Sequence, residues 1–374
     1  MTLTEAFGGL QDPRTGPAQR HDLREMILMA LCAVLCGADT WVDVAEWAED
    51  NTSWLRRYLV LERGTPSHDT FGRVFRILDA KVFEQCFRGW ISGLVGVIGG
   101  VVALDGKTLC GSRNGDNTAL HMISAFATSS GLCLGQEGTR GKGHEITGIK
   151  ALLDTLTLKG CIVTIDAIGC QTEIAQKIVD QGGDYLLAVK DNQEKLAQAL
   201  REFFAEGDTG GFGTLPVSRY QTIGKDHGRI ETRTHLWVTD LHWLDRPIRQ
   251  HWPKLAGVGM VERTREINGK TSTERAFYIG SKGILDAVAF ANAARSHWGI
   301  ENKLHWVLDV TFREDDCRVR KDHAPQNLSA LRKFALTLLR QDQQYPKRSL
   351  QGRRKTAGRI PDYRASLLGL TPLI

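Results

Sequence analysis

Disulfide and zinc-ribbon patterns are missing from this sequence, although it contains eight cysteines. The cysteines are scattered, none belongs to a CxxC pair, and several lie inside apolar runs. This distribution argues against a disulfide framework and against a cysteine-bound zinc ion. It predicts buried free thiols in a reducing compartment.

Export and membrane signals are missing as well. The N-terminus has no basic segment followed by an apolar one, so no signal peptide is expected. The longest apolar run, Met26 to Cys36, is too short to cross a bilayer. We therefore expect a soluble, cytoplasmic protein that has no membrane partner.

Acidic residues are scarce near the C-terminal end. The chain of 374 residues carries a net charge of +5, and residues 317–359 contain twelve Lys or Arg but only two acids. Such an excess indicates a polyanion as partner, although a solvated, disordered tail has the same composition. Pro346 and the closely spaced cations after it favour an extended arm over a packed helix. We expect residues 346–374 to form this basic tail.

The hydrophobic pattern divides the rest of the chain into helical and sheet-forming parts. Residues 22–90 show helical periodicity, which predicts an N-terminal helical domain over residues 1–92. Residues 93–345 then give three strands joined by short turns, followed by alternating helices and strands. This order predicts an α/β domain with a mixed sheet flanked by helices. Residues 207–283 interrupt the alternation and read as a β-rich insertion.

Two aspartates follow buried apolar strands of this predicted sheet. Asp105 ends VVALD and Asp166 ends CIVTID, and functional residues gather at the carboxyl ends of such strands. If the strands are neighbours, the two carboxylates repel each other unless a cation lies between them, and Lys107 alone is insufficient. Oxygen ligands favour Mg²⁺ or Mn²⁺. Glu301, beside the apolar stripe of a predicted helix, could complete a two-metal site for phosphoryl transfer.

Two other interpretations of Glu301 are open. It could be a partly exposed glutamate that pairs with Lys303 or His305. It could also bind zinc with His297 and His305, which lie on the same helical stripe. Eight residues separate the two histidines, or about 12 Å along a helix, so all three groups cannot reach one ion. The HExxH motif of zinc peptidases is also absent.

Several motifs together carry a resemblance to a known family. ALDGKTLCGS, TIDAIGCQ, AVKDNQ and HWGIENKLHWVLDVTFREDD resemble the DDE-type insertion-sequence transposases of the H-repeat-associated kind, and PSHDTFGRVF resembles their small associated domain. The likeness runs from about residue 10 to about residue 345. It implies an RNase H-like core with a β insertion between the second acid and the glutamate. It also implies that Asp105, Asp166 and Glu301 are the catalytic DDE triad and the ligands of Mg²⁺ or Mn²⁺.

The resemblance implies a function as well. Such an enzyme hydrolyses the phosphodiester at the ends of a mobile element and joins those ends to target DNA. Its partners would be the terminal inverted repeats and the target DNA, bound by a homodimer that is associated with the nucleoid. A stand-alone nuclease with the same core and a catalytically inactive, DNA-binding relic are the alternatives. Candidate DNA contacts are Lys107, Lys190, Arg295 and His297, and in the basic tail Arg353, Arg354 and Lys355.

The sequence departs from related transposases at three positions. Cys110 stands where relatives often have arginine. In enzymes with a Tyr-Arg-Glu-Lys signature, arginine precedes the glutamate by four residues and lysine follows it by seven; here these positions hold His297 and Leu308. Arg295 and His297 could contact the phosphate instead, whereas no residue obviously replaces the lysine.

Overall fold

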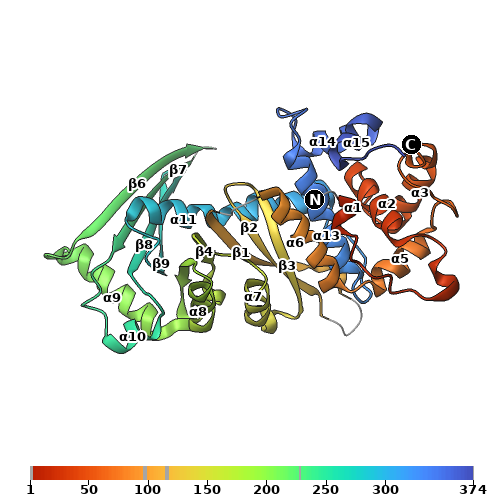
Figure 1. Cartoon of the computed structure of the whole chain (residues 1–374). Helices are drawn as coiled ribbons and strands as arrows, with labels where there is room; N and C mark the ends of the chain where they lie inside the picture. Colours follow the sequence, from red (N-terminus) through yellow and green to blue (C-terminus); the bar gives the residue numbers. More distant parts are fainter. Residues whose placement is uncertain (1–2, 96–98, 114–117, 227–228, 374) are drawn as a thin grey trace.

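A single mixed sheet of nine strands forms the centre of the protein (Figure 1). The computed structural model describes residues 3–95, 99–113, 118–226 and 229–373. The strand order is β3-β2-β1-β4-β5-β9-β8-β7-β6. Strands β1, β4 and β5 run parallel, and the other neighbours are antiparallel. The predicted fold class, a mixed α/β sheet with helices and an N-terminal helical region, is confirmed.

The first five strands carry the predicted mixed sheet. Helices α7 and α8 lie against one face of it, and the long helix α11 crosses the opposite face (Figure 1). The strands are buried because their residues are apolar on both faces, as expected for parallel strands covered by helices. Their bounds are β1 Gly100–Leu109, β2 Leu120–Ala127, β3 Leu132–Arg140, β4 Cys161–Ile165 and β5 Asp184–Val189, and those of the helices are α7 Glu145–Leu153, α8 Thr172–Asp180 and α11 Ala287–Ile300.

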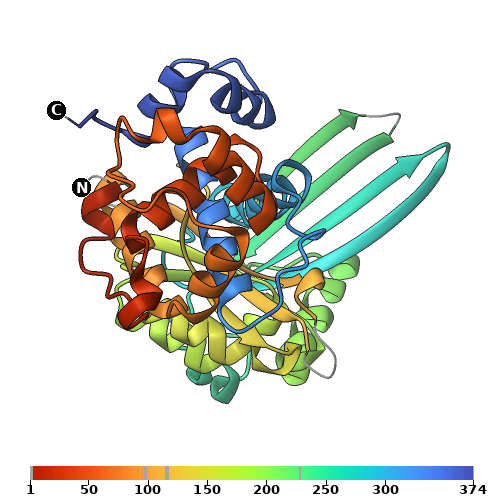
Figure 2. The same ribbon diagram turned by 90° about the vertical axis from the view of Figure 1, so that its right-hand side faces the viewer.

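The β-rich stretch extends this sheet. Strand β9 pairs with β5, with Val189 opposite Phe277, so the inserted strands continue the core sheet without a break. Two long hairpins, β6–β7 and β8–β9, project from the body of the molecule (Figure 2). The bounds are α9 Glu194–Gly210, β6 Val217–Asp226, β7 Arg229–Val238, α10 Arg246–His251, β8 Gly257–Ile267 and β9 Lys270–Gly280.

The N-terminal helices form a layer beside the other edge of the sheet (Figure 1). Asp22 caps α2, because its carboxylate accepts a hydrogen bond from the Glu25 N–H. Helix α13, far along the chain, packs against α2, α5 and α6. The bounds are α1 Leu3–Ala6, α2 Leu23–Cys36, α3 Trp41–Asp50, α4 Thr52–Leu55, α5 His68–Ile77, α6 Ala80–Val95 and α13 Ala324–Gln341.

The C-terminal end is folded, and the prediction of an extended arm is wrong. Helices α14, Leu350–Arg359, and α15, Pro361–Leu368, pack on α2 and on each other. Arg354 is buried and donates hydrogen bonds to the carbonyl oxygens of Val34 and Ala38, which lie at the C-terminal end of α2. The Val34 carbonyl otherwise accepts only a long hydrogen bond, 3.3 Å, from the Gly37 N–H, and Ala38 lies just past the helix. The guanidinium group therefore supplies donors that the helix end lacks.

Arg353 has a similar internal role. It is buried and donates to the carbonyl oxygens of Leu339 at 2.7 Å and Pro346 at 2.9 Å. Of the three tail residues expected to contact DNA, only Lys355 is exposed. The sequence showed the positive charges of this end but not the backbone carbonyl groups that accept their hydrogen bonds.

The cysteines and the apolar helices can be compared with the expectations from composition. None of the eight cysteines, all of which lie in the described ranges, forms a disulfide; Cys32, Cys133, Cys161 and Cys170 are buried, and Cys110 is exposed. Across the described ranges, no single helix is long and apolar enough to span a membrane. The pair α2 and α3, bent by 98°, passes a test of length and composition only when the two are taken together.

Candidate active site

The three predicted acids line one cavity of about 560 Å³. Asp105 lies in β1, and Asp166 follows the last residue of β4. Strands β1 and β4 are parallel neighbours with Leu104 opposite Ile165, so Asp105 and Asp166 lie side by side towards the carboxyl ends of the two strands. Glu301 approaches from the end of α11. The structure therefore brings together the three acids that the sequence singled out.

The helix that carries Glu301 changes its winding at this residue. Residues Glu301–His305 form a π-helix between α11 and α12, Trp306–Phe312. Such segments are rare and are frequently found at functional sites. The widened turn leaves Glu301 exposed and buries His305, whose Nδ1 lies 3.4 Å from Asp105 Oδ2. Within the described part of the chain, the Glu301 carboxylate forms no hydrogen bond or ion pair, so it is available to a ligand.

Burial and mutual repulsion disfavour the charged forms of the aspartates. The pKa of Asp105 is raised to about 7, chiefly by burial and further by the nearby carboxylates of Asp166, Glu301 and Glu145, against a hydrogen bond from the Gly106 N–H. The pKa of Asp166 is also raised, by burial and then by Glu145. A cation at this site would remove the repulsion, because it stabilises the ionised form of each carboxylate.

The donor set suits a hard divalent cation. Carboxylate oxygens are the ligands that Mg²⁺ and Mn²⁺ favour. As they stand, no three His, Cys, Asp or Glu side chains of the described residues are close enough together to hold one metal ion. The acids would have to turn further into the cavity on binding. The exposed Glu301, which has no partner to give up, can do so most easily.

His297 of α11 and His305 of the π-helix are both neutral near neutral pH. Burial lowers the pKa of His297 to about 4, and burial together with nearby lysines lowers the pKa of His305 to about 3. His297 lines the acid cavity, and its Nδ1 lies 3.1 Å from Thr164 Oγ1. It can therefore offer a hydrogen bond to a phosphate but no positive charge.

The predicted lysine contacts lie in different surroundings. Lys107 is mostly buried and forms ion pairs with Asp309, Glu314 and Asp315, so its charge is already balanced inside the fold. Lys190 is exposed and lines the acid cavity. Arg295 lines a second, adjoining cavity. Lys190 is thus the cation of this group best placed to meet a phosphate near the acids.

Sequence reasoning missed a fourth acid, Glu145, at the start of α7. Its Oε1 lies 3.3 Å from His121 Nε2, and its charge acts on both aspartates. Gly106 makes room for this pair, since a Cβ there would lie 2.2 Å from His121 Nε2 and 2.6 Å from Glu145 Oε1. The glycine next to Asp105 was the only signal in the sequence that another group approaches the strand here.

Comparison with known families and proteins agrees with this geometry. A family model described as "Transposase DDE domain" matches residues 70–338, and one described as "DDE_Tnp_1-associated" matches residues 4–91. The chain therefore belongs to the family of transposases with a DDE domain, which are phosphoryl-transfer enzymes. This confirms the resemblance stated above.

Individual relatives narrow the placement within the family. The chain is 36% identical over 373 residues to "H repeat-associated putative transposase YhhI" of Escherichia coli (strain K12), covering 98% of this chain and 97% of that protein. It is 37% identical over 346 residues to "Putative transposase YncI" of Escherichia coli O157:H7, covering 91% and 87%. A stretch of 54 residues is 39% identical to "Inactive transposase YbfQ" of strain K12, covering 14% and 64%.

One solved structure is also similar. It is the piggyBac transposase synaptic complex with hairpin DNA, at 11% sequence identity and a TM-score of 0.44, covering 98% of this chain and 76% of that one.

Proposed function

We propose that this protein is an active DNA transposase that nicks the ends of its element in a metal-dependent reaction and joins the freed 3′ ends to target DNA. One observation carries the proposal: Asp105, Asp166 and Glu301 come from three separate elements and line one cavity. A structural role would not require three acids in one cavity, where burial, and then their mutual repulsion, raises the pKa of Asp105. Such an enzyme would act on DNA in the cytoplasm, in association with the nucleoid, as a homodimer that holds two element ends.

Each residue has a definite task in this proposal. Asp105 and Asp166 would hold Mg²⁺ or Mn²⁺ from the sheet edge, and Glu301 would complete the coordination from the π-helix. When bound, the metal lowers the pKa of the attacking water and neutralises charge on the phosphate. The neutral His305 orients the Asp105 carboxylate, and Lys190 contacts the DNA backbone beside the acids.

Isosteric variants test the triad. We expect Asp105→Asn, Asp166→Asn and Glu301→Gln each to reduce nicking of an element-end DNA by more than the ~10- to 100-fold typical of groups that only support a metal ligand. DNA binding should persist, because phosphate contacts lie elsewhere. Glu194→Gln, an exposed acid at the start of α9, is the matched control. Nicking by Glu301→Gln at the wild-type rate would contradict the assignment.

The choice of metal can be tested separately. We expect Mg²⁺ or Mn²⁺ to support nicking, because the proposed ligands are all oxygen donors. Activity supported by Zn²⁺ alone and lost in His305→Ala would instead favour a zinc site. Strand transfer in a reaction with two paired ends separates a transposase from a stand-alone nuclease, and metal-independent binding without nicking would identify an inactive relic.

A further inference from the structure

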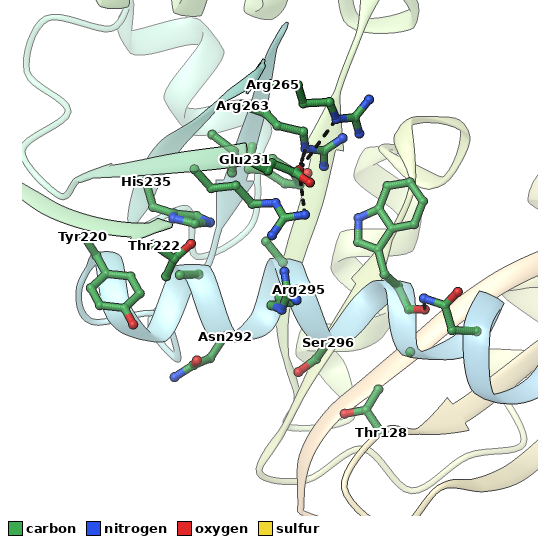
Figure 3. A pocket seen from close by; sticks show the side chains of 18 of the residues that line it. Thr128, Tyr220, Thr222, Glu231, His235, Arg263, Arg265, Asn292, Arg295 and Ser296 are labelled. Atoms are coloured by element: carbon green, nitrogen blue, oxygen red, sulfur yellow. Dashed lines mark hydrogen bonds and ion pairs between the residues drawn. The ribbon is translucent and has the colours of Figure 1, made fainter. Parts of the chain in front are cut away.

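A second cavity, of about 730 Å³, lies between α11 and the inner face of strands β6–β8 (Figure 3). Arginine side chains dominate its lining. The four from the strands belong to no motif that the sequence analysis recognised. Its arginines are Arg229 and Arg233 of β7, Arg263 and Arg265 of β8, and Arg295 of α11.

The strand register places these arginines on one face of the sheet. Glu231 lies opposite Arg265, and Arg233 lies opposite Arg263, in the antiparallel pair β7–β8. Alternate residues of a strand share a face, so Arg229 joins them. Like charges directly opposite each other are destabilising, and Arg233 and Arg263 form such a pair. The cluster therefore needs a negative partner.

Glu231 supplies part of that negative charge from inside the cluster (Figure 3). Its side chain is only 7% exposed. Its Oε1 lies 2.6 Å from Arg233 Nη2, 3.2 Å from Arg263 Nε and 3.7 Å from Arg265 Nε. Its Oε2 lies 3.9 Å from Arg229 Nη2. One carboxylate thus orients several guanidinium groups toward the cavity.

The charges of the cavity do not balance. Besides Glu231, Glu274 lies 3.7 Å from Arg263, so two glutamates face five arginines. A cluster that served only to bury Glu231 would need no such excess, since a buried charge is compensated by one or two partners. Guanidinium groups bind phosphate oxygens through paired, charge-assisted hydrogen bonds. Tyr220 of β6 and Asn292 and Ser296 of α11 add hydroxyl and amide groups to the lining of the same cavity.

This cavity adjoins the acid cavity. Arg263 and Trp298 line both, and the Arg263 guanidinium lies 5.8 Å from the centre of the Trp298 ring. Trp298 is 48% exposed, one helical turn before Glu301. A DNA strand whose phosphate lies at the acids would reach the arginines by passing over this tryptophan.

We propose that Arg229, Arg233, Arg263, Arg265 and Arg295, held by Glu231, form a cradle that binds the DNA backbone next to the phosphate under attack. The cradle contacts backbone phosphates, whose geometry matches guanidinium forks. Phosphate contacts carry no sequence information, so the cradle should act alike on all DNA sequences. Glu231 is a positioning residue. This inference rests on the proposed function, and it names where the substrate DNA lies.

Arg229 and Arg265 are the residues to change, because they are the most exposed of the strand arginines and lie farthest from Glu231. The full-length Arg229→Ala/Arg265→Ala protein is compared with Arg219→Ala, an exposed arginine on the opposite face of β6. The affinity for an element-end duplex and for an unrelated duplex is measured against salt concentration in EDTA. We expect the double variant to flatten the slope of log affinity against log salt by about 1.8 for both DNAs, since each neutralised phosphate contributes ~0.9. Arg219→Ala should keep the wild-type slope. An unchanged slope in the double variant, with an unchanged melting temperature, would overturn the cradle.

Glu231→Gln tests the positioning role. Simple charge counting predicts tighter DNA binding after the loss of a negative charge, whereas loss of positioning predicts weaker binding. We expect weaker binding, by about 10-fold, and partial rescue by Glu231→Asp. Tighter binding by Glu231→Gln would contradict the positioning role. Because these measurements need no metal, a wild-type protein that binds through the cradle but never nicks DNA would refute the proposed function and leave the cradle standing.

Discussion

Asp105 is buried beside other acids, and this makes the stability of the metal-free protein depend on pH. Burial raises the pKa of Asp105 to about 7 in the folded protein, from its ordinary value of 3.8. The folded state therefore binds the Asp105 proton more tightly than the unfolded chain does. The stabilisation that results is fully present below pH 3.8 and is lost as the pH rises through about 7. Glu84, whose pKa burial raises to about 8, contributes in the same direction.

We expect the melting temperature of the metal-free wild type to fall more steeply between pH 5 and pH 8 than that of Asp105→Asn, by roughly a few degrees. Mg²⁺ at pH 8 should raise the melting temperature of the wild type and have little effect on the variant. Thermal unfolding followed by circular dichroism measures both. Parallel pH curves for the two proteins would show that the Asp105 carboxyl titrates as it does in the unfolded chain.

Gly111 allows two distant segments to touch just beyond β1. A Cβ at this position would lie 1.9 Å from the carbonyl oxygen of Cys317, which is backbone and cannot swing aside. We expect Gly111→Ala to lower the free energy of unfolding by about 1–3 kcal/mol, as overpacking does. Gly143→Ala is the control, because nothing lies within 4 Å of its added methyl group. Equal urea midpoints for the two variants would contradict the close approach.

At this scale the sequence predicted the positions of the acids better than the surroundings of the cations. Asp105 and Asp166 could be expected side by side because each follows an apolar strand of the same sheet, and they line one cavity. The contacts of Lys107 and Arg354 could not be predicted, because their partners, Asp309 and the carbonyl oxygen of Val34, lie more than 200 residues away in sequence. Charge alone does not distinguish a residue that meets DNA from one that completes a buried network.

Two neighbouring cations of helix α14 lie in opposite surroundings, one buried and one exposed. Arg354 donates hydrogen bonds to the end of α2, pairs with Asp39 at 3.0 Å and lies over the Phe312 ring, whereas its neighbour Lys355 is exposed. We expect Arg354→Ala to destabilise the protein by about 3 kcal/mol or more, since several buried acceptors lose their donor. Lys355→Ala should stay within about 0.5 kcal/mol of wild type.

Urea unfolding of both variants measures the difference. Similar urea midpoints for the two variants would indicate that Arg354 is a surface residue, as the composition suggested. The helix could have been anticipated from Ser349, which caps α14 by accepting a hydrogen bond from the Gly352 N–H. The burial of α14 against α2 could not be anticipated, because no periodic pattern of apolar residues marks one face of this helix.

The continuity of the nine-stranded sheet is the main property of the whole molecule that the sequence did not reveal. Short strand-like runs predicted a β-rich insertion, but nothing local indicated that β9 pairs with β5. Strand pairing is decided by long-range register, which a single sequence does not encode visibly. The same limit hid the arginine cradle, since its members become neighbours only through the β7–β8 register.

Removal of the C-terminal helices should affect folding and not only DNA binding. We expect a chain ending at Tyr345 to melt at a lower temperature, by about 5 °C or more, because α2 loses the packing of α14 and α15. Lys355→Ala in the full-length chain controls for the loss of exposed charge. A truncated protein with the wild-type melting temperature and a flatter salt dependence would instead support a DNA-binding arm.

The hydrogen bonds between Arg354 and the end of α2 also set an order of events during synthesis. The donor follows the carbonyl of Val34 by 320 residues, so the ribosome releases α2 long before its partner exists. Domains usually fold as they emerge, N-terminal part first. Helix α2 can pack on α3 as soon as both are made, but its C-terminal end lacks the Arg354 donor until almost the whole message has been read. A message cut short upstream of α14 would therefore produce a chain whose N-terminal layer folds with this helix end unprotected.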